Sequence, residues 1–265
     1  AVGKDAGKAI TTGRENAIIG TGAGDALTDA DFNVAVGAGA LSADTLGNRS
    51  TALGYLSLFN QNFAVATNTY NTAVGYGAGQ AVTTGVNNTL VGGLAGDALT
   101  VGYNNVALGY LALSSDTAGN DNTAVGRGAL GSQNFTSATD SLNTGIGYLA
   151  GAGVTTGTEN TFVGGLAGDA NTTASYNTAV GMNSLGANTT GEANSAVGRS
   201  SMLLNTTGIQ NAALGVNALY NNTTASNNTA VGYSALFANT TGTANVAVGS
   251  FAGDALTTGG SNVAI

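Results

Sequence analysis

The chain has 265 residues, 43 of them glycine, and contains no Cys, His, Pro or Trp; its formal net charge is −8. Only 8% of the residues are charged, against roughly 25% in an average soluble domain. The six Lys and Arg residues are scattered, which argues against nucleic-acid binding, because phosphate neutralisation needs clustered cations. No apolar run reaches the roughly 18 residues that a membrane span needs, so we expect no such span.

One short motif returns along the whole chain. It is an Asn followed, after two residues, by Val, Ile or Leu and then Gly. Asn228–Gly232 reads NTAVG, and the same five residues stand at Asn71–Gly75, Asn122–Gly126 and Asn177–Gly181. Successive copies are 17 residues apart, with two intervals of 21. A short fixed period is typical of repeat proteins whose units pack on their neighbours, and we number each unit from 1 to 17, starting at this Asn.

A unit of 17 residues is too short for a pair of helices, but it suffices for one coil of a parallel β-solenoid. Positions 2 to 4 predict a strand, and positions 2 and 4 share one face of it. Position 4 is always aliphatic, so we expect it to form the core. Position 3 is nearly always Ala, which indicates an opposite face that is close-packed or pressed against another chain. The invariant Gly at position 5 predicts a corner where φ is positive or a close backbone approach excludes a Cβ.

The predicted fold is therefore all-β, a parallel β-solenoid or β-roll of about fifteen 17-residue coils, with residues 1–265 forming a single repeat domain. Equivalent residues of successive coils would stack about 4.8 Å apart. The Asn ladder would satisfy itself through amide hydrogen bonds, and the aliphatic ladder would be the core. Representative members of the ladders are Asn71, Val74, Gly75, Asn88, Val91, Gly92, Asn122, Val125, Gly126, Asn228, Val231 and Gly232.

The two longer intervals look like one four-residue insertion that was copied, near residues 60–70 and 132–142. We expect Gln61–Tyr70 and Gln133–Leu142 to protrude from an otherwise regular solenoid. Phe63 and Phe135 would then be exposed, and Tyr70 is a further candidate ligand residue of these loops. Because ligand sites are disproportionately carried by loops, these insertions are the first candidates for a binding site.

Tyrosine is frequent at position 6, directly after the corner Gly. Sugar-binding surfaces often use exposed aromatic rings, so Tyr76 and Tyr148 are further ligand candidates. The alternative interpretation, which we favour, is that each ring only covers the glycine corner. The other tyrosines at this position are Tyr55, Tyr110 and Tyr233.

The sequence gives little support for a catalytic site or a metal site. Without His and Cys the chain lacks the commonest general base and the thiol nucleophile, so we expect no enzyme and no cofactor. Asp25, Asp29 and Asp31 form the densest acidic cluster. Calcium-binding β-rolls carry their Gly- and Asp-rich motif in consecutive repeats, which this chain does not, so we expect no metal site.

Two polar patterns leave alternatives open. Thr-Thr pairs such as Thr189–Thr190 stand at positions 13 and 14 and raise the hypothesis of an ice-binding face, although adjacent residues point to opposite sides of a strand. Asn-Thr-Thr sequons at position 12 would be exposed on one edge. They could carry glycans in a suitable host, or serve as turn residues with local hydrogen bonds, which we favour. The sequon residues are Asn171, Asn188, Asn205, Asn222 and Asn239.

Each coil has one assured large aliphatic side chain, whose burial contributes about 1.5–3 kcal/mol. Ordering each residue costs about 1–2 kcal/mol, so the apolar burial within a single solenoid looks too small to offset this cost. We therefore predict side-by-side association through the Ala face, as a homotrimer, with a filament of other symmetry as the alternative.

The segment Asn228–Asn245, NTAVGYSALFANTTGTAN, resembles the repeats of bacterial and phage surface fibres. Its first residues are similar to the head repeats of trimeric autotransporter adhesins, and the 17-residue form looks like tail-fibre proteins that often carry a self-cleaving chaperone domain. The resemblance covers essentially the whole chain. It implies a left-handed parallel β-roll, three chains per fibre and an extracellular, cell-surface or virion location. Adhesin heads usually have a shorter repeat, and neither an anchor, a stalk nor a chaperone domain is seen in this sequence.

The predicted function is a non-enzymatic structural or adhesive segment of such a fibre. The partners would be other copies of the chain and a host surface glycan or receptor, with no nucleic acid. The first alternative is a self-assembling extracellular filament subunit, because open solenoid ends invite end-to-end strand stacking. An ice-binding solenoid is the less favoured alternative.

Overall fold

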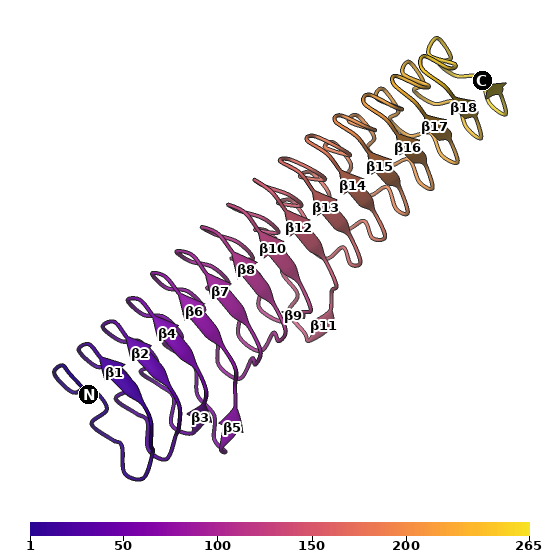
Figure 1. The fold of residues 1–265 in the computed structure, drawn as a ribbon. Coiled ribbons are helices and arrows are strands. Elements are labelled where there is room, and N and C mark those ends of the chain that lie inside the picture. Colours follow the sequence, from indigo (N-terminus) through magenta and orange to yellow (C-terminus); the bar gives the residue numbers. More distant parts are fainter. The chain divides into compact units, whose positions relative to one another are not determined.

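The computed structural model describes residues 1–265 and confirms the predicted all-β fold, a parallel β-solenoid of about fifteen turns without helices (Figure 1). The chain divides into two compact units with the same coil architecture. Unit 1 comprises Ala1–Gly128 and Asn134–Asp140, and unit 2 comprises Ala129–Gln133 and Ser141–Ile265. The boundary between the units therefore lies at the second insertion and just before it.

Unit 1 has seven strands in parallel pairing, one from each coil, and two short strand pairs formed by the insertions and the coils before them. The short pairs are β3 (Gly47–Asn48) with β5 (Thr67–Asn68) and β9 (Gly119–Asn120) with β11 (Thr139–Asp140). The seven strands are β1 (Ala17–Ile19), β2 (Val34–Val36), β4 (Thr51–Leu53), β6 (Thr72–Val74), β7 (Thr89–Val91), β8 (Val106–Leu108) and β10 (Thr123–Val125).

Unit 2 has eight parallel strands, and each strand pairs in register with the equivalent residues of the next coil. Thr161 pairs with Thr178, and Val163 with Val180, so like residues form columns. The eight strands are β12 (Thr144–Ile146), β13 (Thr161–Val163), β14 (Thr178–Val180), β15 (Ser195–Val197), β16 (Ala212–Leu214), β17 (Thr229–Val231), β18 (Val246–Val248) and β19 (Val263–Ala264).

The rest of each coil consists of turns that are also bonded from coil to coil. The amide of Thr189 donates to the carbonyl of Thr206 at 2.9 Å, one coil on. The turns are tight because non-glycine residues take left-handed backbone angles; Asn183, Leu185 and Ala193 have φ of 57°, 55° and 55°. Stacked turns therefore satisfy most of the backbone polar groups that the short strands leave unpaired.

The invariant Gly at position 5 is explained by backbone sterics, as expected. Gly181 has φ of 130°, which side-chain-bearing residues rarely adopt. A Cβ at Gly181 would lie 2.6 Å from the carbonyl oxygen of Gly198, the corner glycine of the next coil. No side chain fits between corners stacked this closely.

The core does not lie where position 4 predicts, and that expectation is wrong. In every three-residue strand the middle residue, position 3, is buried, while positions 2 and 4 are exposed or half-exposed. Val74, Val91, Val125 and Val231 thus form an outer column. The small Ala at position 3 faces inward because the opposite wall of the coil fills that space with larger side chains from positions 9 and 12. The Ala face is consequently inside the chain's own coil and is not a surface for association.

In many coils the side chains at positions 3 and 9 share the core volume, whereas in the coil with Gly145 and Gly151 side chains of neighbouring coils fill it. Where position 3 is Ala, as at Ala179, position 9 is often Leu, as at Leu185, and both are fully buried. Where position 3 is large, position 9 is Gly: Phe162 occurs with Gly168, and a Cβ at Gly168 would lie 2.4 Å from the Phe162 ring. The pairs Ile18 with Gly24 and Leu90 with Gly96 follow the same rule.

The Asn ladder at position 1 is buried and links neighbouring coils. The backbone amide of Asn194 donates to Oδ1 of Asn177 at 3.0 Å. The side-chain Nδ2 of Asn194 donates to the carbonyl of Gly208 at 2.8 Å, and Oδ1 accepts the amide of Asn211 at 3.0 Å. Each Asn therefore satisfies both a backbone donor and a backbone acceptor in the core.

The sequon residues at position 12 form a second buried ladder, so the prediction that they are exposed is wrong. Nδ2 of Asn205 donates to Oδ1 of Asn188 at 2.8 Å and to the carbonyl of Gly208 at 3.1 Å. The local bond is the turn contact that we favoured, but the side chain points inward. In the folded chain it is closed to a glycan. All five are fully buried: Asn171, Asn188, Asn205, Asn222 and Asn239.

The insertions also differ from their prediction, because their first residues enter the core. Phe63 and Phe135 are only 6% and 8% exposed, so the expectation that they are surface residues is wrong. Nε2 of Gln61 donates to Oδ2 of Asp44 at 2.6 Å, and Oε1 of Gln61 accepts from Asn71 at 2.9 Å. This buried polar network fixes the start of the insertion in the core, and Phe63, two residues after Gln61, is buried as well.

The half-buried Asp97 gives a prediction on pH. Burial raises the pKa of this carboxyl, and its Oδ1 is buried without a hydrogen-bond partner. A raised pKa means that the folded chain holds this proton more tightly than the unfolded chain. The free energy of unfolding therefore falls as pH rises from the ordinary value of 3.8 through the raised pKa. We expect Asp97→Asn to raise the melting temperature at pH 7 but not near pH 3.

Thermal unfolding followed by circular dichroism checks this expectation. Asp254→Asn is the matched control, since Asp254 occupies the same position 10 but is exposed. Equal melting temperatures of Asp97→Asn and the wild type at both pH values would contradict the prediction.

Candidate functional site

The most unusual surface of the molecule is the outer face of the parallel sheet in each unit. It consists of positions 2 and 4 of every coil, and no element of the same unit covers it (Figure 1). Position 2 is Thr, Val, Ala or Ser, and position 4 is Val, Ile or Leu without exception. No charged residue occurs at either position, so the outer face is an uncharged strip along each unit.

The aliphatic side chains of this outer face are open to solvent. Ile19 in unit 1 is 50% exposed and Leu214 in unit 2 is 52% exposed. Because the strands are in register, these side chains repeat in columns about 4.8 Å apart. The other clearly exposed aliphatic residues of the face include Val34, Leu53, Val106, Leu108, Ile146, Val246, Val248, Val263 and Ile265.

Parallel sheets in proteins normally have both faces covered, because their strands are apolar on both sides. Here the inner face packs within the coil and the outer face packs on nothing. An exposed aliphatic column within an uncharged strip is typical of an interaction surface. A second copy of the chain carries the same columns at the same spacing, so the geometry suits contact between copies.

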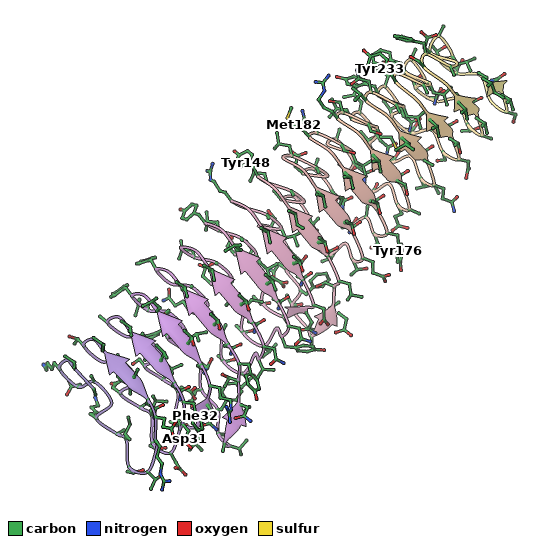
Figure 2. The ribbon with its side chains drawn as sticks, viewed as in Figure 1. Asp31, Phe32, Tyr148, Tyr176, Met182 and Tyr233 are labelled. Atoms are coloured by element: carbon green, nitrogen blue, oxygen red, sulfur yellow. The ribbon has the colours of Figure 1, made fainter.

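The tyrosine candidates are exposed but are not gathered into one site. Tyr148 and Tyr233 lie along one edge of unit 2, whereas Tyr176 lies on the opposite edge (Figure 2). Tyr70 belongs to position 17, as Tyr176 does, and Tyr76 belongs to position 6, as Tyr148 does. The insertion residue and the turn tyrosines therefore occupy different edges of their coils.

The rings at position 6 contact the neighbouring coil. Tyr76 stacks on Tyr55 with ring centroids 5.7 Å apart. The Tyr110 ring lies 3.5 Å from the point where a Cβ of Gly93 would stand, so it covers the position-6 glycine of the preceding coil. These contacts support the interpretation that the rings cover the turn.

The two residues of each Thr pair differ in their exposure, as the alternation of side chains along a strand predicts. The Thr189 hydroxyl at position 13 donates to the carbonyl of Thr206 at 3.1 Å, so this column is used between coils. Position 14 is exposed and carries Thr in each successive coil of unit 2. Of the two Thr columns, only position 14 is therefore an exposed one.

The acidic residues near the N-terminus have separate partners. Asp25 pairs with Lys8 at 3.1 Å, and Asp31 accepts the backbone amide of Arg14 at 2.6 Å. No group of three acidic side chains in the structure is arranged to hold a metal ion. The structure also has no helix with the length and apolar character that a membrane crossing requires.

Comparison with known proteins gives no assignment. No family model, no curated protein and no solved structure matches the chain. The structure establishes a β-solenoid repeat protein, and the resemblance to fibre repeats remains a prediction from the sequence.

Proposed function

We propose that the chain is a structural and adhesive segment of an extracellular or virion fibre, in which copies associate side by side through the outer face. The observation that carries the proposal is the position-4 column, which is aliphatic in every coil although it lies outside the core. Where one face of a sheet is exposed to solvent, the strand positions on that face are normally polar. An uncharged column in every coil suits a surface that is buried in an assembly.

The proposed assembly is a homotrimer. Three copies around one axis, each with its outer face turned inward, would enclose the Val, Ile and Leu columns in a shared apolar core. Burial contributes about 25 cal/mol per Å² of apolar surface, so a long strip gives a stable contact. The turns and insertions would then face outward, where a host glycan or receptor is accessible. This arrangement agrees with the three-chain fibres that the sequence resembles.

An ice-binding solenoid is the second candidate, because position 2 of the outer face is Thr in several coils and lies beside the aliphatic column. It differs from the fibre in stoichiometry, since it requires the outer face to be free in solution. A filament with end-to-end stacking differs from both, since it grows without a fixed number of copies.

The test is the mass of the purified chain by light scattering, with electron microscopy for shape. We expect a particle of three times the chain mass of 25.6 kDa. The double variant Ile146→Lys with Leu214→Lys places charges on the outer face of unit 2 and should give a folded monomer. The control Thr207→Lys with Thr241→Lys places the same charges on the exposed position-14 column and should leave the mass unchanged.

Other outcomes select the other candidates. A wild-type monomer that shows thermal hysteresis in ice would contradict the fibre and favour ice binding. Long filaments that persist in the outer-face variant would favour the end-to-end subunit. A trimer that withstands the outer-face lysines would show that copies meet elsewhere.

A further inference from the structure

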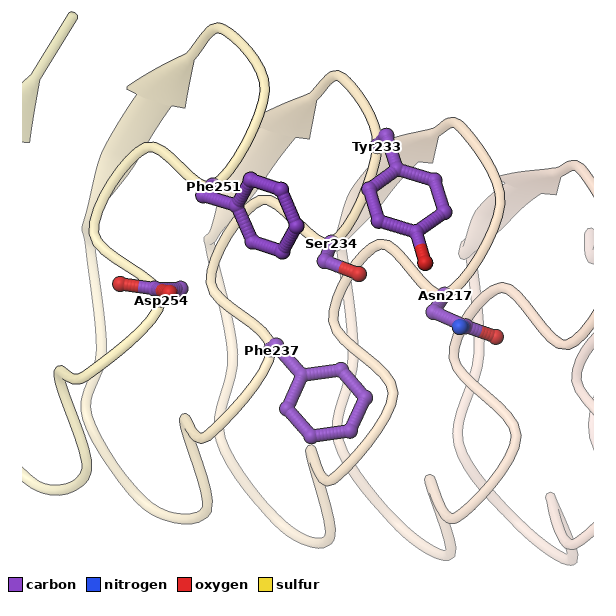
Figure 3. A pocket seen from close by; sticks show the side chains of 6 residues that line it. All are labelled: Asn217, Tyr233, Ser234, Phe237, Phe251 and Asp254. Atoms are coloured by element: carbon purple, nitrogen blue, oxygen red, sulfur yellow. The ribbon is translucent and has the colours of Figure 1, made fainter.

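A cavity of about 240 Å³ lies on the turn surface of unit 2, between the rows formed by positions 6 and 7 and by position 10 of successive coils. It lies among turns, away from the outer face of the sheet. The cavity is open to solvent. Its lining residues are Asn217, Tyr233, Ser234, Phe237, Phe251 and Asp254 (Figure 3).

Aromatic rings form two sides of the cavity. Phe251 and Tyr233 stand on one side and Phe237 on the other (Figure 3). Tyr233 and Phe251 meet edge to face with centroids 5.2 Å apart, and Phe237 stacks on Tyr220 at 5.2 Å. Each ring is therefore held by a partner, while Phe251 and Tyr233 stay about half exposed. Rings fixed in this way present apolar faces at little further entropic cost.

The polar groups of the cavity have no partner within the chain. Ser234 is only 6% exposed, lines the cavity, and its hydroxyl makes no hydrogen bond in the protein. The side chains of Asn217 and Asp254 stand toward the two ends of the cavity and also make no hydrogen bond (Figure 3). Together they offer one hydroxyl, one amide and one carboxylate, a set with both donors and acceptors.

We infer that this cavity binds a neutral pyranose unit of an oligosaccharide or polysaccharide. A pyranose has an apolar C–H face that lies against an aromatic ring and a rim of hydroxyls that a carboxylate, an amide and a hydroxyl can bond. Sites that combine apolar walls with a few convergent polar groups are typical of small-ligand binding. The volume is below the roughly 300–1,000 Å³ of drug-sized pockets and suits one ring, with the rest of the glycan extending into solvent through the open side of the cavity.

The negative charge of the protein favours a neutral ligand over an acidic one. Asp254 lies at the rim and the chain carries a net charge of −8, so phosphates, sulfated sugars and uronic acids are disfavoured. The inference goes beyond the proposed assembly and does not depend on it, because the cavity shares no residue with the outer face.

The experiment is saturation-transfer NMR on the intact chain with maltohexaose, cellohexaose, chitohexaose and mannohexaose, and with a heparin tetrasaccharide as the acidic probe. Titration then gives the dissociation constant of the best neutral probe. We expect one or more neutral probes to bind and the acidic probe not to bind. Phe251→Ala and Asp254→Asn should each weaken the binding at least tenfold without changing the circular dichroism spectrum, since both residues are exposed.

The matched control is Tyr76→Ala, which removes an exposed, stacked ring of unit 1 that does not line the cavity, and it should bind as the wild type does. Binding of none of the four neutral probes, or of the acidic probe alone, would overturn the inference. So would wild-type affinity in Phe251→Ala. The mass of each sample, measured in parallel, shows separately whether the proposed assembly holds.

Discussion

Gly168→Leu is expected to destabilise unit 2 severely, and the further change Phe162→Ala is expected to restore most of the lost stability. At Gly168 even a Cβ would lie 2.4 Å from the Phe162 ring, so Leu cannot enter while Phe162 is present. Overpacking typically costs about 1–3 kcal/mol, and more where neighbours cannot move. Phe162→Ala alone opens a cavity in the core and should cost about 3–5 kcal/mol.

The double variant recreates an arrangement that the chain already uses. One coil on, Ala179 stands at position 3, Leu185 at position 9 and Asn188 at position 12, and all three are fully buried. Leu185 also has φ of 55°, close to the 57° of Gly168, so Leu is compatible with this backbone. Urea unfolding of the wild type, both single variants and the double variant forms a double-mutant cycle, in which we expect a coupling energy of at least about 2 kcal/mol.

The inverse exchange is the control. Ala179→Phe alone should overpack its coil, and Ala179→Phe with Leu185→Gly should be tolerated better. Additive free energies in both cycles would show that positions 3 and 9 do not compete for one volume. That result would remove the explanation given for the Gly and Leu alternation.

The sequence was sufficient for the fold because the determinants of a solenoid are local and repeated. The 17-residue interval gives the coil, and the invariant glycines follow from the contact between corners such as Gly181 and Gly198. Each constraint recurs in every coil, so one correct interpretation applies along both units.

The orientation of the sheet was not predicted, because the period of two shows which residues share a face but not which face is inside. Side-chain size alone places the larger residues at position 4 in the core. The signal that contradicts this assignment was present in the sequence: Gly occupies position 9 wherever position 3 is Ile, Leu or Phe. Residues that exchange volume in this way must face each other across a core.

The cavity in unit 2 could not be predicted from single positions. It combines positions 6, 7 and 10 of three coils, and their juxtaposition depends on the path of the turns. The aromatic residues Tyr220, Tyr233, Phe237 and Phe251 are close in sequence, and this enrichment is the one signal that pointed to the region. The predicted exposure of Phe63 and Phe135 in the insertions is wrong for a related reason, since the hydrogen-bond partners of Gln61 lie in other coils.

The second large effect is expected at the buried Asn ladder. Asn194→Ala would leave the buried amide of Asn211 without its Oδ1 acceptor, and it would remove one of the two Nδ2 donors to the carbonyl of Gly208, which keeps that of Asn205. Leaving a buried polar group unpaired costs about 1–3 kcal/mol, so we expect a loss of about 1–3 kcal/mol in unfolding free energy. Urea unfolding measures it, and Ser195→Ala, one residue on but exposed, should change the value by less than about 0.5 kcal/mol.

The chain itself shows what a gap in this ladder requires. Ser50 replaces Asn once, and there the Thr69 hydroxyl lies 2.6 Å from the Ser50 hydroxyl and 3.4 Å from the amide of Asn71. Nε2 of Gln61 donates to the same Ser50 oxygen at 2.8 Å. The insertion thus supplies the polar groups that the shorter side chain lacks. Asn194→Ser, in a coil without an insertion, should therefore be nearly as unstable as Asn194→Ala, and wild-type stability of Asn194→Ser would show that the ladder tolerates a gap without compensation.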